Sequence, residues 1–135
     1  MGKSHYNAGN TLSFPAGADL STSQYLAVKN DGSGGLVLAT AGTDVILGTI
    51  KVPSTSGYVS GSNFDVVEVF ARSSSGTILA VASTTIAPSA AVTATTGGQV
   101  VTTTTPGDQI IGYYVGNHSA VANEIIEIMP STGKY

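Results

Sequence analysis

The sequence contains an internal repeat, and no other feature constrains the fold as strongly. When the chain is shifted by 64 positions, the distance from Val28 to Val92, two long segments align without a gap. The identical pairs are Val28/Val92, Gly34/Gly98, Val37/Val101, Thr40/Thr104, Asp44/Asp108, Ile46/Ile110 and Gly48/Gly112. The similar pairs Leu36/Val100 and Leu47/Ile111 support the same alignment. An ungapped match of this length indicates that one structural unit occurs twice.

The alignment continues toward both ends with small gaps. Thr11-Leu12 aligns with Thr77-Ile78, and residues 65–70 align with 123–129 so that Glu68 falls on Glu127. These limits predict a single β domain over 11–130, with a first copy at about 11–71 and a second at about 76–130. Residues 1–10 then form an N-terminal arm and residues 131–135 a C-terminal tail. We expect the two copies to share a core that neither could bury alone.

Both copies consist of short segments rich in Val, Ile and Thr, separated by Gly, Pro, Ser and Asn. Such segments are typical of β-strands, and no window shows apolar residues at helical spacing among good helix formers. The prediction is an all-β fold, a small barrel or sandwich built from two similar β half-repeats, with an extended N-terminal arm. The expected strands are 11–14, 25–29, 35–40, 45–52, 65–71, 77–82, 90–94, 99–104, 109–115 and 124–129. The expected core residues are Val28, Val37, Ile46, Val67, Val69, Val92, Val101, Ile110, Ile126 and Ile128.

Turn signals fall at equivalent places in the two copies. Residues 30–35 read Asn-Asp-Gly-Ser-Gly-Gly, which faintly resembles a calcium loop, but no bidentate Glu follows at the required offset. A glycine-rich turn is therefore the favoured interpretation. Asp44 and Asp108 each precede an expected strand by one residue, where a carboxylate can accept hydrogen bonds from nearby backbone amides.

Hydroxyl and amide groups, not charges, make this chain polar. Charged residues are 10% of the sequence and the formal net charge is −3, whereas soluble domains usually carry about 25% charged residues. The five basic residues are scattered along the chain, so we expect no nucleic-acid partner. No apolar stretch approaches the roughly 20 residues that span a bilayer, and no secretory signal is recognised, so no membrane partner is expected. Few charges also mean little repulsion between copies, which suits a protein that works in an assembly.

Residues that could support catalysis or hold a cofactor are few and isolated. The chain has two histidines, His5 and His118, and no Cys, so neither a nucleophile–His pair nor a transition-metal site is expected. Glu68 and Glu127 occupy equivalent repeat positions, and paired carboxylates could serve a glycosidase. They also fit the polar positions of two amphipathic strands, which is the stronger interpretation. We predict a protein that is not an enzyme and that has no metal and no cofactor.

The tyrosines are candidate contact residues. Tyr6, Tyr58 and Tyr135 lie in loop-like or terminal sequence, and an exposed Tyr offers an interface apolar area and a hydroxyl at low entropic cost. Partial burial within the domain explains each of them equally well. The arm contains little that could be buried, so we predict that it is disordered in the free protein and becomes ordered between subunits or on a partner, with Tyr6 as its anchor.

Three features of the sequence, one of which occurs twice, resemble bacteriophage capsid decoration proteins, also called cement or head-stabilising proteins. They are the polar arm that leads to a short strand (5–12), the acidic turns that lead to apolar strands ending in Gly (42–48 and 107–112), and the final acidic and apolar strand (124–129). The resemblance implies a homotrimer on the outer capsid surface of the virion, made in the host cytoplasm, which binds the major capsid protein and stabilises the shell. On this hypothesis the capsid or subunit contacts are Lys3, His5, Tyr6, Asn7, Tyr58 and Tyr135.

A carbohydrate- or receptor-binding β module of a tail fibre or adhesin is the alternative. Such a site needs aromatic residues clustered with Asn or Asp on loops. The chain has no Trp and few aromatic residues in its loops, which favours the capsid hypothesis.

Overall fold

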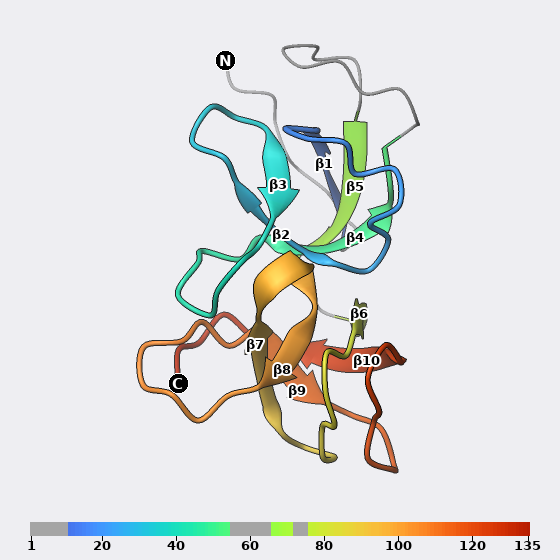
Figure 1. Ribbon diagram of the computed structural model, residues 1–135, viewed down its shortest axis with the longest axis vertical. Coiled ribbons are helices and arrows are strands. Elements are labelled where there is room, and N and C mark those ends of the chain that lie inside the picture. Colours follow the sequence, from blue (N-terminus) through green and yellow to red (C-terminus); the bar gives the residue numbers. More distant parts are fainter. Residues whose placement is uncertain (1–10, 55–65, 72–75) are drawn as a thin grey trace.

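Two antiparallel sheets of five strands each make up the part of the chain that the structure describes. The structure, a computed structural model, describes residues 11–54, 66–71 and 76–135. The first sheet comes from the first half of the chain and the second sheet from the second half, and the two lie one above the other in Figure 1. In the described part of the chain, no helix has the length and apolar character needed to cross a membrane.

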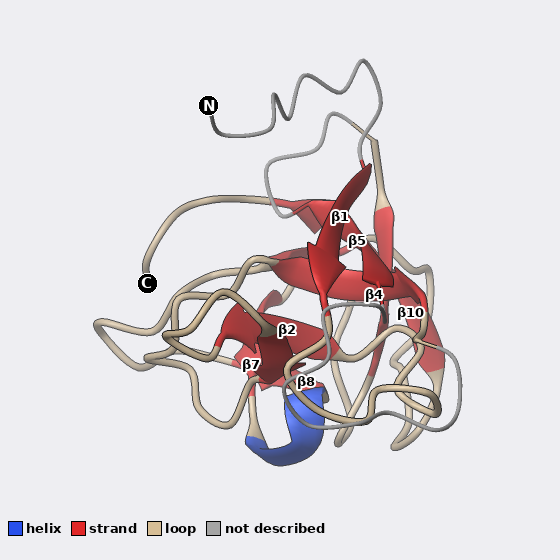
Figure 2. Cartoon of the chain, turned by 90° about the horizontal axis from the view of Figure 1, so that it is seen from above, coloured by secondary structure: helices blue, strands red, loops and turns tan. Residues whose placement is uncertain are grey.

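The strands agree closely with those expected from the sequence. The first sheet contains β1 (Thr11–Pro15), β2 (Ala27–Asn30), β3 (Leu36–Leu38), β4 (Gly48–Val52) and β5 (Val66–Ala71). The second contains β6 (Ile78–Val81), β7 (Ala91–Ala94), β8 (Val100–Thr102), β9 (Gly112–Tyr114) and β10 (Ile125–Pro130). Figure 2 shows these strands joined by loops, with one short 3-10 turn, Thr96–Gly98, between β7 and β8. The all-β prediction is confirmed.

The two halves are copies of one topology. The strand order is β1-β5-β4-β2-β3 in the first sheet and β6-β10-β9-β7-β8 in the second, so each strand has a counterpart five places later. The register repeats as well: Val28 pairs with Leu38 and with Gly48, and Val92 pairs with Thr102 and with Gly112. The predicted half-repeats are therefore present in the backbone pairing as well as in the sequence.

Each sheet curls until its two outermost strands meet. Ala16, just after β1, forms a parallel bridge with Leu36 at the start of β3. Ala82, just after β6, forms the same bridge with Val100 at the start of β8. Each half is consequently a small barrel whose interior is filled by the side chains that point inward.

The interior residues form two buried clusters. Ala16, Leu20, Val28, Leu36, Ile50 and Val69 fill the first half. The larger cluster fills the second half, but it also includes Ala27, Ala39 and Ile46 from the first half. The halves therefore share part of their core, as expected for units too small to bury enough apolar surface alone.

Seven of the predicted core residues are buried: Val28, Ile46, Val69, Val92, Ile110, Ile126 and Ile128. Val37 and Val101 are only half-buried, so their placement in the core was wrong. They are the middle residues of three-residue strands, and side chains alternate between faces along a strand. Leu36 and Val100, one residue earlier, take the buried positions instead. The side chain of Val67 lies outside the described residues.

The segment 30–35 is a turn built on side-chain hydrogen bonds. The Asn30 side chain accepts a hydrogen bond from the Gly32 amide at 2.7 Å, and the Asp31 carboxylate accepts one from the Ser33 amide at 2.7 Å and one from the Gly35 amide at 3.1 Å. Gly32 and Gly34 have φ of +91° and +95°, which a side chain would strain. These residues thus form the glycine-rich turn favoured by the sequence.

Candidate interaction surfaces

The first half inserts a loop against the second half. The carbonyl oxygen of Gly42 accepts a hydrogen bond from the backbone N–H of Gln109 at 2.8 Å and lies 3.5 Å from the hydroxyl of Thr93. A Cβ atom on Gly42 would lie 2.6 Å from Cγ of Asp108, so a side chain here would have to displace the Asp108 carboxylate.

Two further contacts extend this junction. The hydroxyl of Thr49 on β4, which is completely buried, donates a hydrogen bond to the carbonyl oxygen of Leu79 on β6 at 2.6 Å. Gly98 packs so closely on the first half that an added Cβ would lie 2.8 Å from the carbonyl oxygen of Ala27 and 3.1 Å from Cβ of Leu26. In the described residues, the two halves are therefore joined by polar and apolar contacts spread over several strands.

A hollow of about 570 Å³ lies on the first half beside β2 and β3. Its lining combines the apolar residues Val37, Val45 and Leu47 with the polar residues Lys29, Asn30, Asp31, Thr43 and Asp44. Val45 is 69% exposed. The hollow therefore offers a partner apolar surface beside a charged pair.

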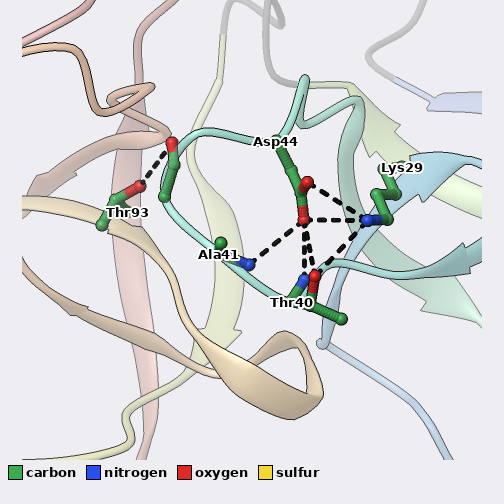
Figure 3. A network of polar contacts seen from close by, with 6 residues as sticks. Lys29, Thr40, Ala41, Asp44 and Thr93 are labelled. Atoms are coloured by element: carbon green, nitrogen blue, oxygen red, sulfur yellow. Dashed lines mark hydrogen bonds and ion pairs between the residues drawn. The ribbon is translucent and has the colours of Figure 1, made fainter.

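That charged pair belongs to a network around Asp44 (Figure 3). Its carboxylate lies 3.1 Å from the ammonium nitrogen of Lys29 and accepts hydrogen bonds from the backbone amides of Thr40 and Ala41 at 2.8 and 3.1 Å. The predicted role of Asp44 as a turn-forming acceptor is confirmed. In the second half, the hydroxyl of Thr103 donates a hydrogen bond to Asp108 at 2.6 Å.

The network favours the ionised form of Asp44. Partial burial raises the pKa of this carboxyl, but hydrogen bonds from the Thr40 amide, Lys29, the Ala41 amide and the Thr40 hydroxyl outweigh burial and hold the pKa below its ordinary value. The carboxylate therefore stays charged and keeps Lys29 and the turn in place.

The outer face of β9 and β10 carries a group of exposed apolar side chains. Tyr113, Ile125 and Met129 are 38%, 54% and 53% exposed, and Val115 lies just beyond β9. Tyr113 pairs with Met129 across the two strands. A concentration of exposed apolar residues on one sheet face is typical of a surface that another chain covers.

His118 contacts polar side chains of its own loop. Its Nε2 lies 3.0 Å from a carboxylate oxygen of Glu124 and its Nδ1 lies 3.2 Å from the Asn117 side chain. The backbone N–H of Val121 and then His118 lower the pKa of Glu124. These hydrogen bonds join residues 117–124 and stabilise the loop before β10.

Of the contact residues predicted from the sequence, the structure places Tyr135. It is 50% exposed, and its backbone bonds to Gly107 and Asp108 in the loop before β9. Lys3, His5, Tyr6, Asn7 and Tyr58 lie outside the described residues.

The complete architecture has a counterpart among solved structures. The chain is similar to the N base of the head fiber gp8.5 of bacteriophage phi29. The TM-score is 0.65, and the likeness covers 93% of this chain and 98% of that chain at 19% sequence identity. At this identity the likeness shows a shared fold. No family model and no curated protein matches the chain.

Sequence reasoning missed the exposed residues Val45, Tyr113, Ile125 and Met129. A signal was available for the last two, because the strand Glu124–Met129 has Ile125 and Met129 on the same face as Glu127, whereas a strand exposed on one side usually alternates apolar and polar residues. Val45 and Tyr113 align with the polar residues Gln109 and Thr49 of the other copy. A difference in polarity at equivalent positions was the available signal for these two.

Proposed function

We propose that this protein is a structural component of a phage virion that binds the outer surface of the capsid and stabilises the shell. It works as a homotrimer, contacts the major capsid protein and carries out no chemistry. The observation that supports this function best is the shared fold with a part of a phage head fiber, over nearly the full length of both chains.

The surface supports a role in broad contacts. Exposed apolar side chains lie on both halves, at Val45 in the first and at Tyr113, Ile125 and Met129 in the second. With 10% charged residues, the chain offers a partner a surface that is easily desolvated. Such faces suit a protein that makes extended contacts with a shell and with its own copies.

Three-fold association would strengthen binding to a shell. A trimer presents each capsid contact three times, so weak single contacts sum to a tight attachment. The resemblance to decoration proteins supplies the number three, and the charge-poor surface supports self-association.

The decisive experiment measures binding of the purified full chain to empty expanded capsids and to precursor shells by co-sedimentation. We expect binding to expanded capsids, and we expect coated capsids to resist heat or chelators better than bare capsids. Equal robustness of coated and bare capsids would overturn the proposal, as would failure to bind either form.

The arm provides a second test. Deletion of residues 1–10 should weaken capsid binding, because an arm that becomes ordered on its partner adds contacts there. Tyr6→Ala should have the same effect, weakening binding by about tenfold if Tyr6 is an anchor, and a circular dichroism spectrum should show that the domain still folds. Tyr135→Ala removes the tyrosine predicted as a contact at the other end of the chain, and its capsid affinity is compared with that of Tyr6→Ala. Unchanged capsid affinity after deletion of the arm would contradict this role.

A role as the base of a fibre is the second candidate, because the structural neighbour is the N base of a head fiber. In this role the chain would bind the capsid and also hold a projecting partner. A glycan-array screen beside the capsid assay tests the receptor-binding alternative. Glycan binding without capsid binding would favour a receptor-binding module.

A further inference from the structure

We propose that copies of this chain associate head to tail, through a contact between chains that repeats the contact between the two halves of one chain. The junction inside the chain involves two different faces. The inserting face of the first half consists of Ala27, Gly42 and Thr49. The receiving face of the second half consists of Leu79, Thr93, Gly98, Asp108 and Gln109. Since both halves have the same strand order and register, each half contains both kinds of face.

The receiving face of the first half is partly exposed: Val45 is 69% exposed, and the side chains of Lys29 and Asp44, which pair with each other, are 28% and 18% exposed. The 64-residue shift places Lys29, Asp44 and Val45 where the second half has Thr93, Asp108 and Gln109. These three residues line the hollow of about 570 Å³ beside β2. Gly34, the counterpart of Gly98, is exposed, and nothing lies within 4 Å of the position that its Cβ would occupy. The site that accepts the Gly42 loop in the second half is therefore open in the first half.

The inserting face of the second half is also exposed. Tyr113 is the counterpart of Thr49, and Pro106 is the counterpart of Gly42. Thr49 is fully buried within the junction, whereas Tyr113 is 38% exposed and Pro106 is exposed. Tyr135 bonds to the neighbouring residues Gly107 and Asp108, which places the tail beside this face. Thr49, which is buried between the halves, and Gly42, which is half-buried, thus have the exposed counterparts Tyr113 and Pro106.

The side chains on the two exposed faces fit a contact between chains. Pro106 cannot approach as closely as Gly42 does, but it meets an open hollow with Val37, Val45 and Leu47 in its lining. Tyr113 replaces the smaller Thr49 and adds the apolar area and hydroxyl that protein interfaces favour. A second copy of this chain is the partner whose surface matches both faces at once.

A contact between two different faces is heterologous, so a dimer still has one free face of each kind. Repetition gives a closed ring if the rotation between copies closes, and a filament if it does not. This inference rests on the self-association included in the proposed function, but not on capsid binding, and mass in solution tests it without any capsid.

The first measurement is the mass of the purified full chain across micromolar to millimolar concentrations, by analytical ultracentrifugation. The variants are Val45→Glu on the receiving face and Tyr113→Glu on the inserting face. Val121→Glu is the matched control, because Val121 is 60% exposed and outside both faces. We expect each face variant to associate at least about tenfold more weakly, since it would bury an unpaired charge, and the control to associate like the unmodified chain. Thermal unfolding by circular dichroism identifies any variant that fails to fold.

Mixing the two face variants tests the head-to-tail arrangement itself. A Val45→Glu chain keeps its inserting face and a Tyr113→Glu chain keeps its receiving face, so the mixture should form a dimer and nothing larger. An unmodified chain that stays monomeric would overturn the proposal. So would face variants that associate normally, or a mixture that stays monomeric. An unmodified chain that self-associates but binds no capsid would count against the proposed function alone.

Discussion

Alanine at Gly98 should destabilise the protein much more than alanine at Gly34, although the two glycines occupy the same place in the repeat. Their φ angles are +78° and +95°. A left-handed backbone costs an alanine roughly 1–2 kcal/mol, and this penalty applies to both variants. Gly34 has no heavy atom within 4 Å of its added Cβ, whereas at Gly98 the carbonyl oxygen of Ala27 would lie 2.8 Å away.

The difference in free energy of unfolding between the two variants measures how tightly the two halves pack at Gly98. The atoms around Gly98 include the backbone of Ala27, which cannot rotate away, so the halves must shift at a cost of about 1–3 kcal/mol. Gly98→Ala should therefore lower the free energy of unfolding by about 2–5 kcal/mol, and Gly34→Ala by about 1–2 kcal/mol. The entropy that alanine removes from the unfolded chain is the same in both variants and cancels.

Urea unfolding followed by far-ultraviolet circular dichroism is the suitable assay. With a slope of about 2 kcal/mol/M, the two midpoints should differ by about 0.5–1.5 M. Equal midpoints for Gly34→Ala and Gly98→Ala would refute the reasoning, because they would mean that the halves do not press together at this point.

Three further predictions concern the core, the junction and the turn network. Ile128→Ala should lower the free energy of unfolding by about 2–5 kcal/mol because the side chain is fully buried. Ile125→Ala, three residues away and 54% exposed, should change it by less than about 0.5 kcal/mol. Similar losses for both variants in urea titrations would contradict the assignment of Ile128 to the inner face and Ile125 to the outer face of β10. Thr49→Val keeps the shape of the side chain but leaves the carbonyl oxygen of Leu79 without this donor, so calorimetry should show a loss of about 1–3 kcal/mol, and an unchanged melting temperature would contradict the buried hydrogen bond. The folded state lowers the pKa of Asp44, so the stabilising effect of its carboxylate is present at neutral pH and is lost as the pH falls below about 4. The advantage in free energy of unfolding over Asp44→Asn should therefore shrink in acid. A constant difference in free energy between the two proteins from neutral pH to acid would contradict the network.

The strands and the duplication were predictable because both depend on local patterns. Short runs of β-branched residues between glycine-rich turns set the positions of the strands, and the 64-residue shift related the two halves. The main error in the predicted core was the choice of which residues in two short strands face inward. Val37 and Val101 are identical in the two copies, but Leu36 and Val100 face inward.

The sequence does not show which equivalent positions are covered, because their burial depends on how the two halves pack. Thr49 and Tyr113 occupy equivalent strand positions, yet the second half buries Thr49 and leaves Tyr113 exposed. The difference in polarity between Thr49 and Tyr113 does not tell which of them is buried, because the covering surface comes from residues far away in the chain. Similarly, nothing local to Lys29 indicates that its ammonium group lies 3.1 Å from Asp44 across a turn.

The bridges that close the two curled sheets also affect the risk of fibril growth. The outermost strand of an open sheet presents unpaired backbone groups to which any other extended chain can add, and a chain with few charges repels such additions weakly. Here the bridges Ala16–Leu36 and Ala82–Val100 bring the outermost strands of each sheet together. An incoming strand would have to displace contacts that the domain makes with itself. Association through side-chain surfaces is then favoured over strand addition, which lowers the tendency of the folded domain to seed cross-β aggregates.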